Sequence, residues 1–426
     1  MATDPHRTIA AVFAIERPKL IASLTRITRD VGTAEELAQD AFATALEAWP
    51  QTGVPQNPGA WLMLTAKRNA LDAHRRKRTA ARKYDELGHD LREEEQTSPD
   101  LDTALDDDIG DDLLRLIFTA CHPVLSPEAR VALTLRLLGG LTTEEIARAF
   151  IVPEPTIAQR ITRAKKTLRE KQVAYEVPHG EELSERLAAV LEVIYLIFNE
   201  GYAATFGTNW MRPQLCEEAL RLGRVLAELA KDEPEVHGLI ALMELQMSRF
   251  AARVDAGGNA VLLLEQNRAR WDRLLIRRGL AAIERAHGAC VKLSRLPGSY
   301  LLQAELAACH ARASRPEDTD WAKIVGVYGA LNLLAPSPVI ELNRAVALGM
   351  LMGPRAGLEI VDALASDGTL GNYYLLPAVR GDLLARLARH DEAKLEFERA
   401  AAMTQNEKER AVMLKRAAQS AGERLS

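Results

Sequence analysis

The chain of 426 residues is long enough for two to four domains of ordinary size. Hydrophobic residues make up 47% of it, so it can bury a core, and four cysteines in a chain of this length exclude a disulfide-framework protein. The formal net charge of −5 excludes a protein that coats nucleic acid along its whole length.

We expect residues 7–82 to form an all-helical first domain. The apolar run over residues 10–15 is short and Glu16 interrupts it, so we expect neither a signal peptide nor a membrane helix there. No other stretch approaches the length that crosses a bilayer. The sequence therefore predicts a cytoplasmic protein without a membrane partner.

A helix is expected within this domain between residues 33 and 50. Thr33 and Glu36 have the spacing of a capping box, which predicts the helix start. Its apolar face and its carboxylates fall on separate sides, with Leu37, Ala41 and Ala45 on the first and Glu36, Asp40 and Glu47 on the second. Three prolines and one glycine over residues 50–58 predict a loop that breaks the helix, and another helix is expected over residues 59–78.

The charge changes sign abruptly after this helix. Residues 64–83 hold eight Lys or Arg and one Asp, whereas residues 85–112 hold thirteen acidic residues and one Arg. Such segregation predicts a nucleic-acid partner for the basic part. We expect residues 83–110 to be an acidic linker, either a solvated tether or a segment that contacts basic surfaces of its neighbours.

Residues 111–175 are predicted to form a second small helical domain that contains a helix-turn-helix. Thr142 and Glu145 form a capping box, and Ile146, Ala147 and Phe150 give the helix that follows one apolar face. Pro153 and Pro155 suit a short turn and the first turn of a second helix. That helix has a helical apolar stripe made of Ile157, Ile161, Ala164 and Leu168.

The second helix has the composition of a DNA-reading helix. Residues 154–171 hold six Lys or Arg against two Glu. Opposite the apolar stripe lie the polar residues Gln159, Thr162, Arg163 and Lys166, and on its flanks lie Ala158 and Arg160. Arg can pair bidentately with guanine and Gln with adenine, whereas Lys more often holds phosphate. The alternative is an ordinary amphipathic helix with charges on its solvated face.

From residue 181 to residue 426 the pattern is helical throughout. Ala356, Ile360 and Ala363 repeat the spacing of Ala393, Phe397 and Ala400 thirty-seven residues later, and Gly381 lies twelve residues before Ala393. This spacing is typical of tetratricopeptide repeats, although Arg380 stands where that motif prefers an apolar residue. We therefore expect an α-solenoid-like extension, and an all-α fold for the whole chain.

Other residue clusters have less specific interpretations. Residues 198–202 place polar groups directly after an apolar helix, as in a pocket or inter-domain contact, or as in a helix end capped by Gly201. Three neighbouring Cys and His pairs lack zinc-finger spacing and are better explained as buried thiols and surface imidazoles. We find no phosphate-binding loop, nucleophile motif or metal set, so we expect no cofactor, no metal and no enzyme activity.

Two separate stretches together resemble a known family. The sequence GLTTEEIARAFIVPEPTIAQRITRAKKTLRE, residues 140–170, is similar to region 4 of bacterial RNA polymerase sigma factors of the extracytoplasmic-function (ECF) group. AEELAQDAFATALEAWP, residues 34–50, resembles region 2.2, and NPGAWLMLTAKRNALDAHRRKR, residues 57–78, resembles regions 2.3 and 2.4. The resemblance covers about residues 8–175. The remainder resembles the tetratricopeptide-like extension that one ECF subgroup carries.

The resemblance implies two partners, core RNA polymerase and promoter DNA. The helix over residues 34–49 would dock on the polymerase clamp helices through Glu36, Gln39 and Asp40, which otherwise are ordinary solvent-facing polar residues. The helix over residues 59–78 would meet the −10 element. The residues that match the family pattern there are Arg68, Asn69, Asp72, Arg75 and Arg76. Trp61 could stack on a base or belong to the core.

The helix-turn-helix would read the −35 element through Ala158, Gln159, Thr162 and Arg163. Arg160 would support the fold or touch phosphate, and Ala158 departs from relatives that have a cation at this position. The extension would regulate the factor and bind a protein or peptide. The competing hypothesis is a stand-alone helix-turn-helix regulator whose solenoid senses a partner. It differs at residues 8–80, where only a sigma factor needs a docking helix and a melting helix.

Overall fold

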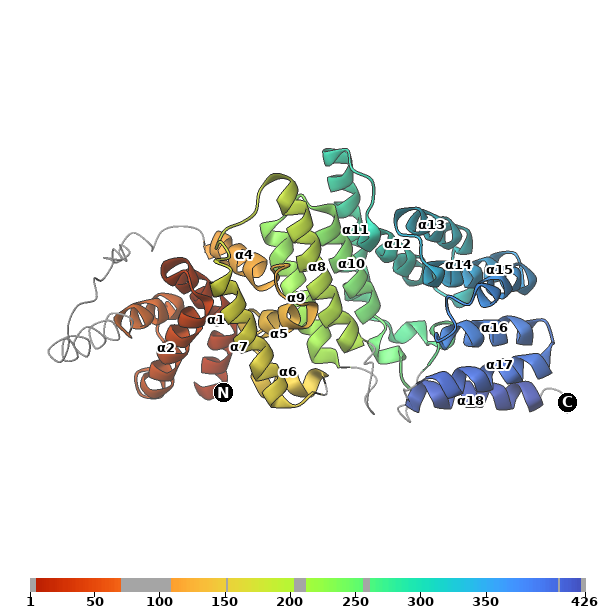
Figure 1. The fold of residues 1–426 in the computed structure, drawn as a ribbon, viewed down its shortest axis with the longest axis horizontal. Coiled ribbons are helices and arrows are strands. Elements are labelled where there is room, and N and C mark those ends of the chain that lie inside the picture. The colour runs from red at the N-terminus through yellow and green to blue at the C-terminus, as the bar shows by residue number, and fades with distance from the viewer. Residues whose placement is uncertain are drawn as a thin grey trace. The chain divides into compact units, whose positions relative to one another are not determined.

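A computed structural model describes residues 5–69, 109–150, 152–202, 212–255, 261–404 and 407–422. All regular elements in these ranges are helices, which confirms the predicted all-α fold (Figure 1). None of the described helices is both long and apolar enough to cross a membrane. The chain divides into two compact units, Met1–Ile194 and Tyr195–Ser426.

The first unit combines the two small domains predicted from the sequence. Its labelled helices are α1 (Pro5–Thr28), α2 (Val31–Thr52), α4 (Ile109–Ala120), α5 (Pro127–Leu137), α6 (Thr143–Phe150), α7 (Glu154–Glu170) and the first part of α8 (Gly180–Tyr202). Residues 58–69 are also helical. Helix α1 packs on α2, α4 and α5, so the predicted first and second domains share one core. The largest fully buried side chains of this core include Trp49, Phe118, Ile21 and Leu62.

The structure corrects both predicted ends of α2. Asp30 is the N-cap, and its side chain accepts hydrogen bonds from the Thr33 backbone N–H (2.7 Å) and hydroxyl (2.8 Å). Thr33 is therefore not the N-cap, and its hydroxyl instead donates to the capping carboxylate. Asp30, three residues earlier, takes the N-cap position because its carboxylate is a better hydrogen-bond acceptor. At the other end the helix includes Pro50 and stops at Gly53, which has a φ of 79° and donates its N–H to the Trp49 carbonyl (2.9 Å).

The predicted capping box of the helix-turn-helix is confirmed. The Thr142 backbone N–H donates to the Glu145 carboxylate (2.8 Å), and the Glu145 N–H donates to the Thr142 hydroxyl (3.1 Å). Helix α6 ends at Phe150 and α7 begins at Glu154, and Pro155 lies in the first turn of α7. Both helix boundaries are thus set by local side chains that the sequence shows directly.

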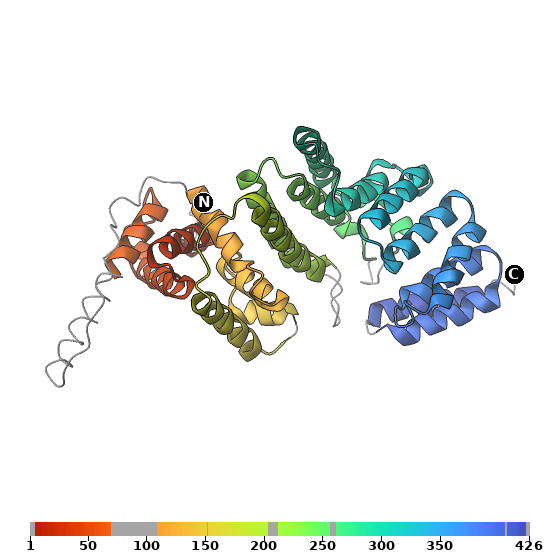
Figure 2. The same ribbon diagram turned by 45° about the horizontal axis from the view of Figure 1, so that its top comes forward.

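The second unit is built from the end of α8 and ten further α-helices. These are α9 (Pro213–Leu229), α10 (Pro234–Met247), α11 (Arg273–Leu293), α12 (Ser299–Arg312), α13 (Trp321–Leu334), α14 (Pro338–Leu351), α15 (Pro354–Asp367), α16 (Leu375–Arg386), α17 (His390–Met403) and α18 (Glu407–Gly422). Helix α10 packs against α9, α11 and α12. From α12 to α18 each helix packs on the next one along the chain, as a solenoid requires (Figure 2).

Only one half of the predicted repeat lies in the core of α14–α18, because Ala356 and Ile360 are half-buried and Ala363 is exposed. Ala393, Phe397 and Ala400 are fully buried. A Cβ on Gly381 would lie 2.9 Å from the Phe397 ring, so only glycine lets α16 and α17 approach this closely. Arg380, the predicted departure from the motif, donates to Asp362 of α15 and Glu396 of α17, both at 2.8 Å. The charged residue therefore links three consecutive helices.

Gly201 is not a helix cap, contrary to one of the two interpretations of residues 198–202. It lies inside α8, and a Cβ there would come within 2.9 Å of Cys216 and of the Arg212 carbonyl. The Arg212 N–H donates to the Gly201 carbonyl (2.7 Å). The glycine is needed because the start of α9 approaches the α8 backbone closely.

Candidate nucleic-acid interface

Helix α7 has a buried stripe and an exposed polar face. Ile157, Ile161, Ala164 and Leu168 are buried, as predicted. The opposite face is exposed and contains Ala158, Gln159, Thr162, Arg163 and Lys166. Arg160 is half-buried on the flank. Hydrogen bonds from the backbone and from Ser126 lower the pKa of Glu128 at the start of α5, and the charge of Arg160 lowers it further. The exposed face has the width and chemistry to enter a major groove.

The polar residues predicted on α2 also face solvent. Glu36, Gln39 and Asp40 are exposed, whereas Leu37, Ala41 and Ala45 are buried. Helix α2 therefore presents carboxylates to the outside while its apolar face forms the core. This face is available for a basic partner surface.

The helix over residues 58–69 positions the first of the predicted −10 residues. Arg68 is exposed and Asn69 is half-buried at the end of the described segment. Asp72, Arg75 and Arg76, together with most of the predicted acidic linker over residues 83–110, lie outside the described residues. Trp61 packs edge-on against the buried Trp49 at 5.3 Å between ring centroids, which agrees with its interpretation as part of the core.

A buried carboxylate that the sequence interpretation missed joins helices from both predicted domains. Glu35 of α2 is 4% exposed and accepts hydrogen bonds from Arg17 of α1 (3.2 Å), Arg136 of α5 (2.7 Å) and Lys165 of α7. Burial by itself would raise the pKa of Glu35, but the surrounding cations Lys165, Arg136 and Arg17 outweigh it and hold the pKa below its usual range. Glu35 is therefore an ionised group at the junction.

Further contacts fasten the same junction. Arg169 of α7 forms two hydrogen bonds with the Asp30 carboxylate (2.7 and 2.8 Å), which lower the pKa of Asp30 to about 2. The buried Asp112 of α4 accepts from Arg26 of α1 at 2.9 Å. The Tyr175 hydroxyl lies 2.8 Å from the carbonyls of Ala22 and Asp112 and shares its one proton between them. Two cations of α7, Lys165 and Arg169, are thus paired with carboxylates of α2 and its N-cap and are not free for DNA.

One sequence signal could have revealed Glu35. It lies on the same helical stripe as Ala38, Phe42, Ala45 and Trp49, all of which are buried. A lone carboxylate on an otherwise apolar stripe needs a charged partner from elsewhere in the fold. The partners themselves could not be named, because they are up to 130 residues away.

Comparisons with known proteins agree with the resemblance. Family models match residues 12–80 (sigma-70 region 2), residues 115–168 (sigma-70 region 4) and residues 186–287 (a family of unknown function, DUF6596). The last of these covers the beginning of the extension.

Relatives match over the whole chain or over its first part. The chain is 44% identical over 397 residues to an uncharacterized protein of Rhizobium meliloti, which covers 93% of this chain and 92% of the relative. It is 27% identical over 174 residues to the probable ECF RNA polymerase sigma factor SigI of Mycobacterium tuberculosis, covering 40% of this chain and 58% of that protein. The ECF RNA polymerase sigma factor SigK of Mycolicibacterium vanbaalenii is 27% identical over 173 residues, covering 40% of this chain and 84% of that protein. No solved structure matches. This chain therefore belongs to the ECF group of sigma-70-like factors and carries an additional helical C-terminal extension.

Proposed function

We propose that this protein binds core RNA polymerase in the cytoplasm and directs it to start transcription at specific promoters. The Glu36, Gln39 and Asp40 face of α2 docks on the polymerase, and α7 reads the −35 element through Gln159, Thr162 and Arg163, flanked by Ala158, Arg160 and Lys166. Arg68 and Asn69, with Asp72, Arg75 and Arg76, meet the −10 element. The polymerase performs the chemistry, so the sigma factor needs no catalytic group of its own.

The observation that carries this proposal is the exposure pattern of the first unit. Helices α2 and α7 bury their apolar stripes and leave exposed several residues that the sigma-70 resemblance assigns to a partner, namely Glu36, Gln39, Asp40, Gln159, Thr162 and Arg163. A polar face with exposed Arg and Gln on α7 suits bases and phosphates, and a carboxylate face on α2 suits a basic protein surface. The two faces belong to different helices and can serve two partners at once.

The compact junction imposes a condition on promoter binding. A folded unit of about 190 residues has a radius of gyration of roughly 16 Å and so a diameter of about 40 Å. The −10 and −35 elements are separated by about 25 base pairs, which is roughly 85 Å of duplex at about 3.4 Å per base pair. We infer that α2 and α7 must separate before both elements are read. The thirty residues from 79 to 108 permit this even if the expected helix is intact to residue 78, because a chain of that length reaches up to about 100 Å when fully extended.

The extension regulates this activity through a protein or peptide partner. The packing of successive helices from α12 to α18 supports this part of the proposal, because stacked helix pairs create extended surfaces suited to peptides and proteins.

Two experiments test the proposal. Purified full-length protein should retain core RNA polymerase in a pull-down and support run-off transcription from a cognate promoter. Glu36→Ala combined with Asp40→Ala should weaken polymerase retention, whereas Glu182→Ala, an exposed carboxylate on α8, should not. A protein that binds promoter DNA but never retains polymerase would instead be a stand-alone regulator.

The role of the extension is tested by truncation. The cut should follow Tyr202 at the end of α8, because Tyr175 and the first part of α8 belong to the first compact unit. A change in promoter-dependent transcription, with the thermal unfolding of the remaining unit intact, is the expected result. Equal activity of the full and truncated proteins under all tested conditions would contradict regulation by the extension.

A further inference from the structure

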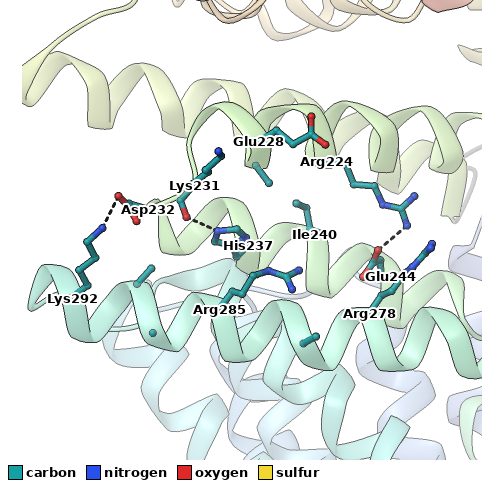
Figure 3. A pocket seen from close by; sticks show the side chains of 14 residues that line it. Arg224, Glu228, Lys231, Asp232, His237, Ile240, Glu244, Arg278, Arg285 and Lys292 are labelled. Atoms are coloured by element: carbon teal, nitrogen blue, oxygen red, sulfur yellow. Dashed lines mark hydrogen bonds and ion pairs between the residues drawn. The ribbon is translucent and has the colours of Figure 1, made fainter. Parts of the chain in front are cut away.

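A groove of about 710 Å³ runs along α10 between α9 and α11, within the second unit (Figure 3). Apolar residues line part of it, namely Ala227, Ile240, Ala281 and Ala289. Gly288 of α11 also lines it, and a Cβ at this position would meet no atom within 4 Å. A glycine inside a helix weakens the helix relative to alanine, and no neighbouring atom requires it here. The space above Gly288 is therefore open.

The α11 side of the groove is a row of cations. Arg278, Arg285 and Lys292 follow each other at intervals of seven residues, so they lie on one side of the helix about 10.5 Å apart. Within the described part of the chain, Arg278 and Arg285 have no hydrogen-bond or ion-pair partner among the contacts observed. Lys292 pairs with the exposed Asp232 at 2.8 Å across one end of the groove. The row therefore offers two unpaired guanidinium groups.

The α9 side has mixed charge and is anchored by a buried carboxylate. Glu244 of α10 is 3% exposed and accepts a hydrogen bond from Arg224 at 2.7 Å. Its second oxygen is buried and has no partner among the described residues, although Arg278 and Arg285 are near enough to act on its charge. A half-satisfied buried carboxylate is costly in a fold and typical of a site that has a function. Next to Arg224 on the rim stand Glu228 and Lys231 (Figure 3).

We propose that this groove binds an amphipathic α-helix of a partner protein whose carboxylates recur every seven residues. Such a helix would place its carboxylates against Arg278 and Arg285, a cation against Glu228, and small apolar residues on the groove floor. The distance from Arg278 to Lys292 is about 21 Å along α11, which corresponds to fourteen residues of a bound helix. Binding of an amphipathic helix in a groove between two helices is a common mode of peptide recognition.

Other ligand classes fit the groove less well. A nucleic acid presents phosphates on every side and would be repelled by Glu228, Asp232 and Glu244, which line the same groove. A small anion would occupy only one of the arginines and would leave the apolar floor empty. A bound helix is the ligand that uses the cationic row, the floor and the mixed rim together.

The test measures binding to full-length protein without DNA or polymerase, so it is independent of the proposed sigma activity. The probe is a fluorescently labelled designed helix of about eighteen residues that has Glu at every seventh position and Ala and Leu on one face. A second probe has Lys in place of each Glu. We expect the Glu probe to bind with a micromolar dissociation constant in low salt and the Lys probe to bind at least tenfold more weakly.

Two protein variants and one control locate the site. Arg278→Glu with Arg285→Glu should weaken the Glu probe at least tenfold and strengthen the Lys probe, because the charge pattern is reversed. Gly288→Trp should block both probes, since a Cβ there meets nothing within 4 Å and the indole would occupy space in the groove. Gly326→Trp is the matched control on α13, where a Cβ also meets nothing within 4 Å, and it should bind like the parent protein. Circular dichroism checks that each variant is folded.

The proposal fails if the Glu probe does not bind the parent protein, if the Lys probe binds equally well, or if Gly288→Trp leaves binding unchanged.

Discussion

Replacing Glu35 by Gln is the most direct test of the junction between the two predicted sigma domains. The substitution keeps the shape of the side chain and removes its charge. Three cations, whose side chains are only 19–23% exposed, would then surround a neutral amide. Breaking one partner of a buried ion pair costs about 3–5 kcal/mol, and the partial exposure of the cations places this case near the lower limit. We expect the free energy of unfolding of the first unit to fall by about 3 kcal/mol.

Urea unfolding followed by circular dichroism measures this loss. Glu47→Gln, an exposed residue of the same helix, is the matched control and should change stability by less than about 0.5 kcal/mol. Separation of α2 from α7 can be followed by energy transfer between labels on Ala43→Cys and Lys171→Cys, both exposed positions. The four native cysteines are buried, so the introduced thiols should react selectively. We expect lower transfer efficiency in the Glu35→Gln protein.

The combination of two effects is diagnostic. If closure of the junction opposes promoter binding, Glu35→Gln should lose stability and yet gain affinity for a promoter that contains both elements. A variant as stable as the parent would refute the energetic reasoning. A loss of stability together with a parallel loss of promoter affinity would refute the inference that the junction must open.

The same carboxylate makes a prediction about pH. Because the pKa of Glu35 is lower in the folded protein than its ordinary value of 4.5, its contribution to stability is complete above that value and is lost as the pH falls through the folded pKa. The stability difference between the parent and Glu35→Gln should therefore be constant from pH 7 to about pH 5 and shrink below pH 4.5. A difference that persists undiminished at pH 3 would contradict this assignment.

Three further substitutions test other parts of the structure. Arg163→Ala should weaken promoter binding by about 1–3 kcal/mol in a filter or anisotropy assay. Arg355→Ala, at an exposed position on α15, is the control and should not weaken it. Equal losses in both variants would contradict the proposal that Arg163 contacts the major groove. Thr142→Ala should cost about 1 kcal/mol of stability in urea unfolding, because it removes the cap of α6, and no change would mean that this helix start frays in solution. Gly381→Ala should destabilise the extension by about 1–3 kcal/mol, while Gly329→Ala, in open space, should stabilise it slightly in thermal unfolding; the reverse order would refute the close packing of α16 on α17.

Much of the fold and of the exposed interface was predictable because it depends on near neighbours in the chain. The capping box of Thr142 and Glu145 involves residues three positions apart, and the buried stripe of α7 depends only on the helical period. The same period placed Glu36 and Asp40 on the outside of α2. These features would form in any fold that buries the apolar side of each helix.

Tertiary structure decided the features that depend on residues far apart in the chain. Asp30 caps α2 and also accepts hydrogen bonds from Arg169, which is 139 residues away in the chain. Glu35 accepts a hydrogen bond from Arg136, which is 101 residues away. Position 201 requires a glycine because the start of α9 lies close to its backbone. The groove above Gly288 exists because α9 and α11 both pack on α10. A charge or a glycine in a sequence shows that a partner or a space is required, but only the folded chain shows which one, because the energy of a buried contact depends on distances that local patterns do not determine.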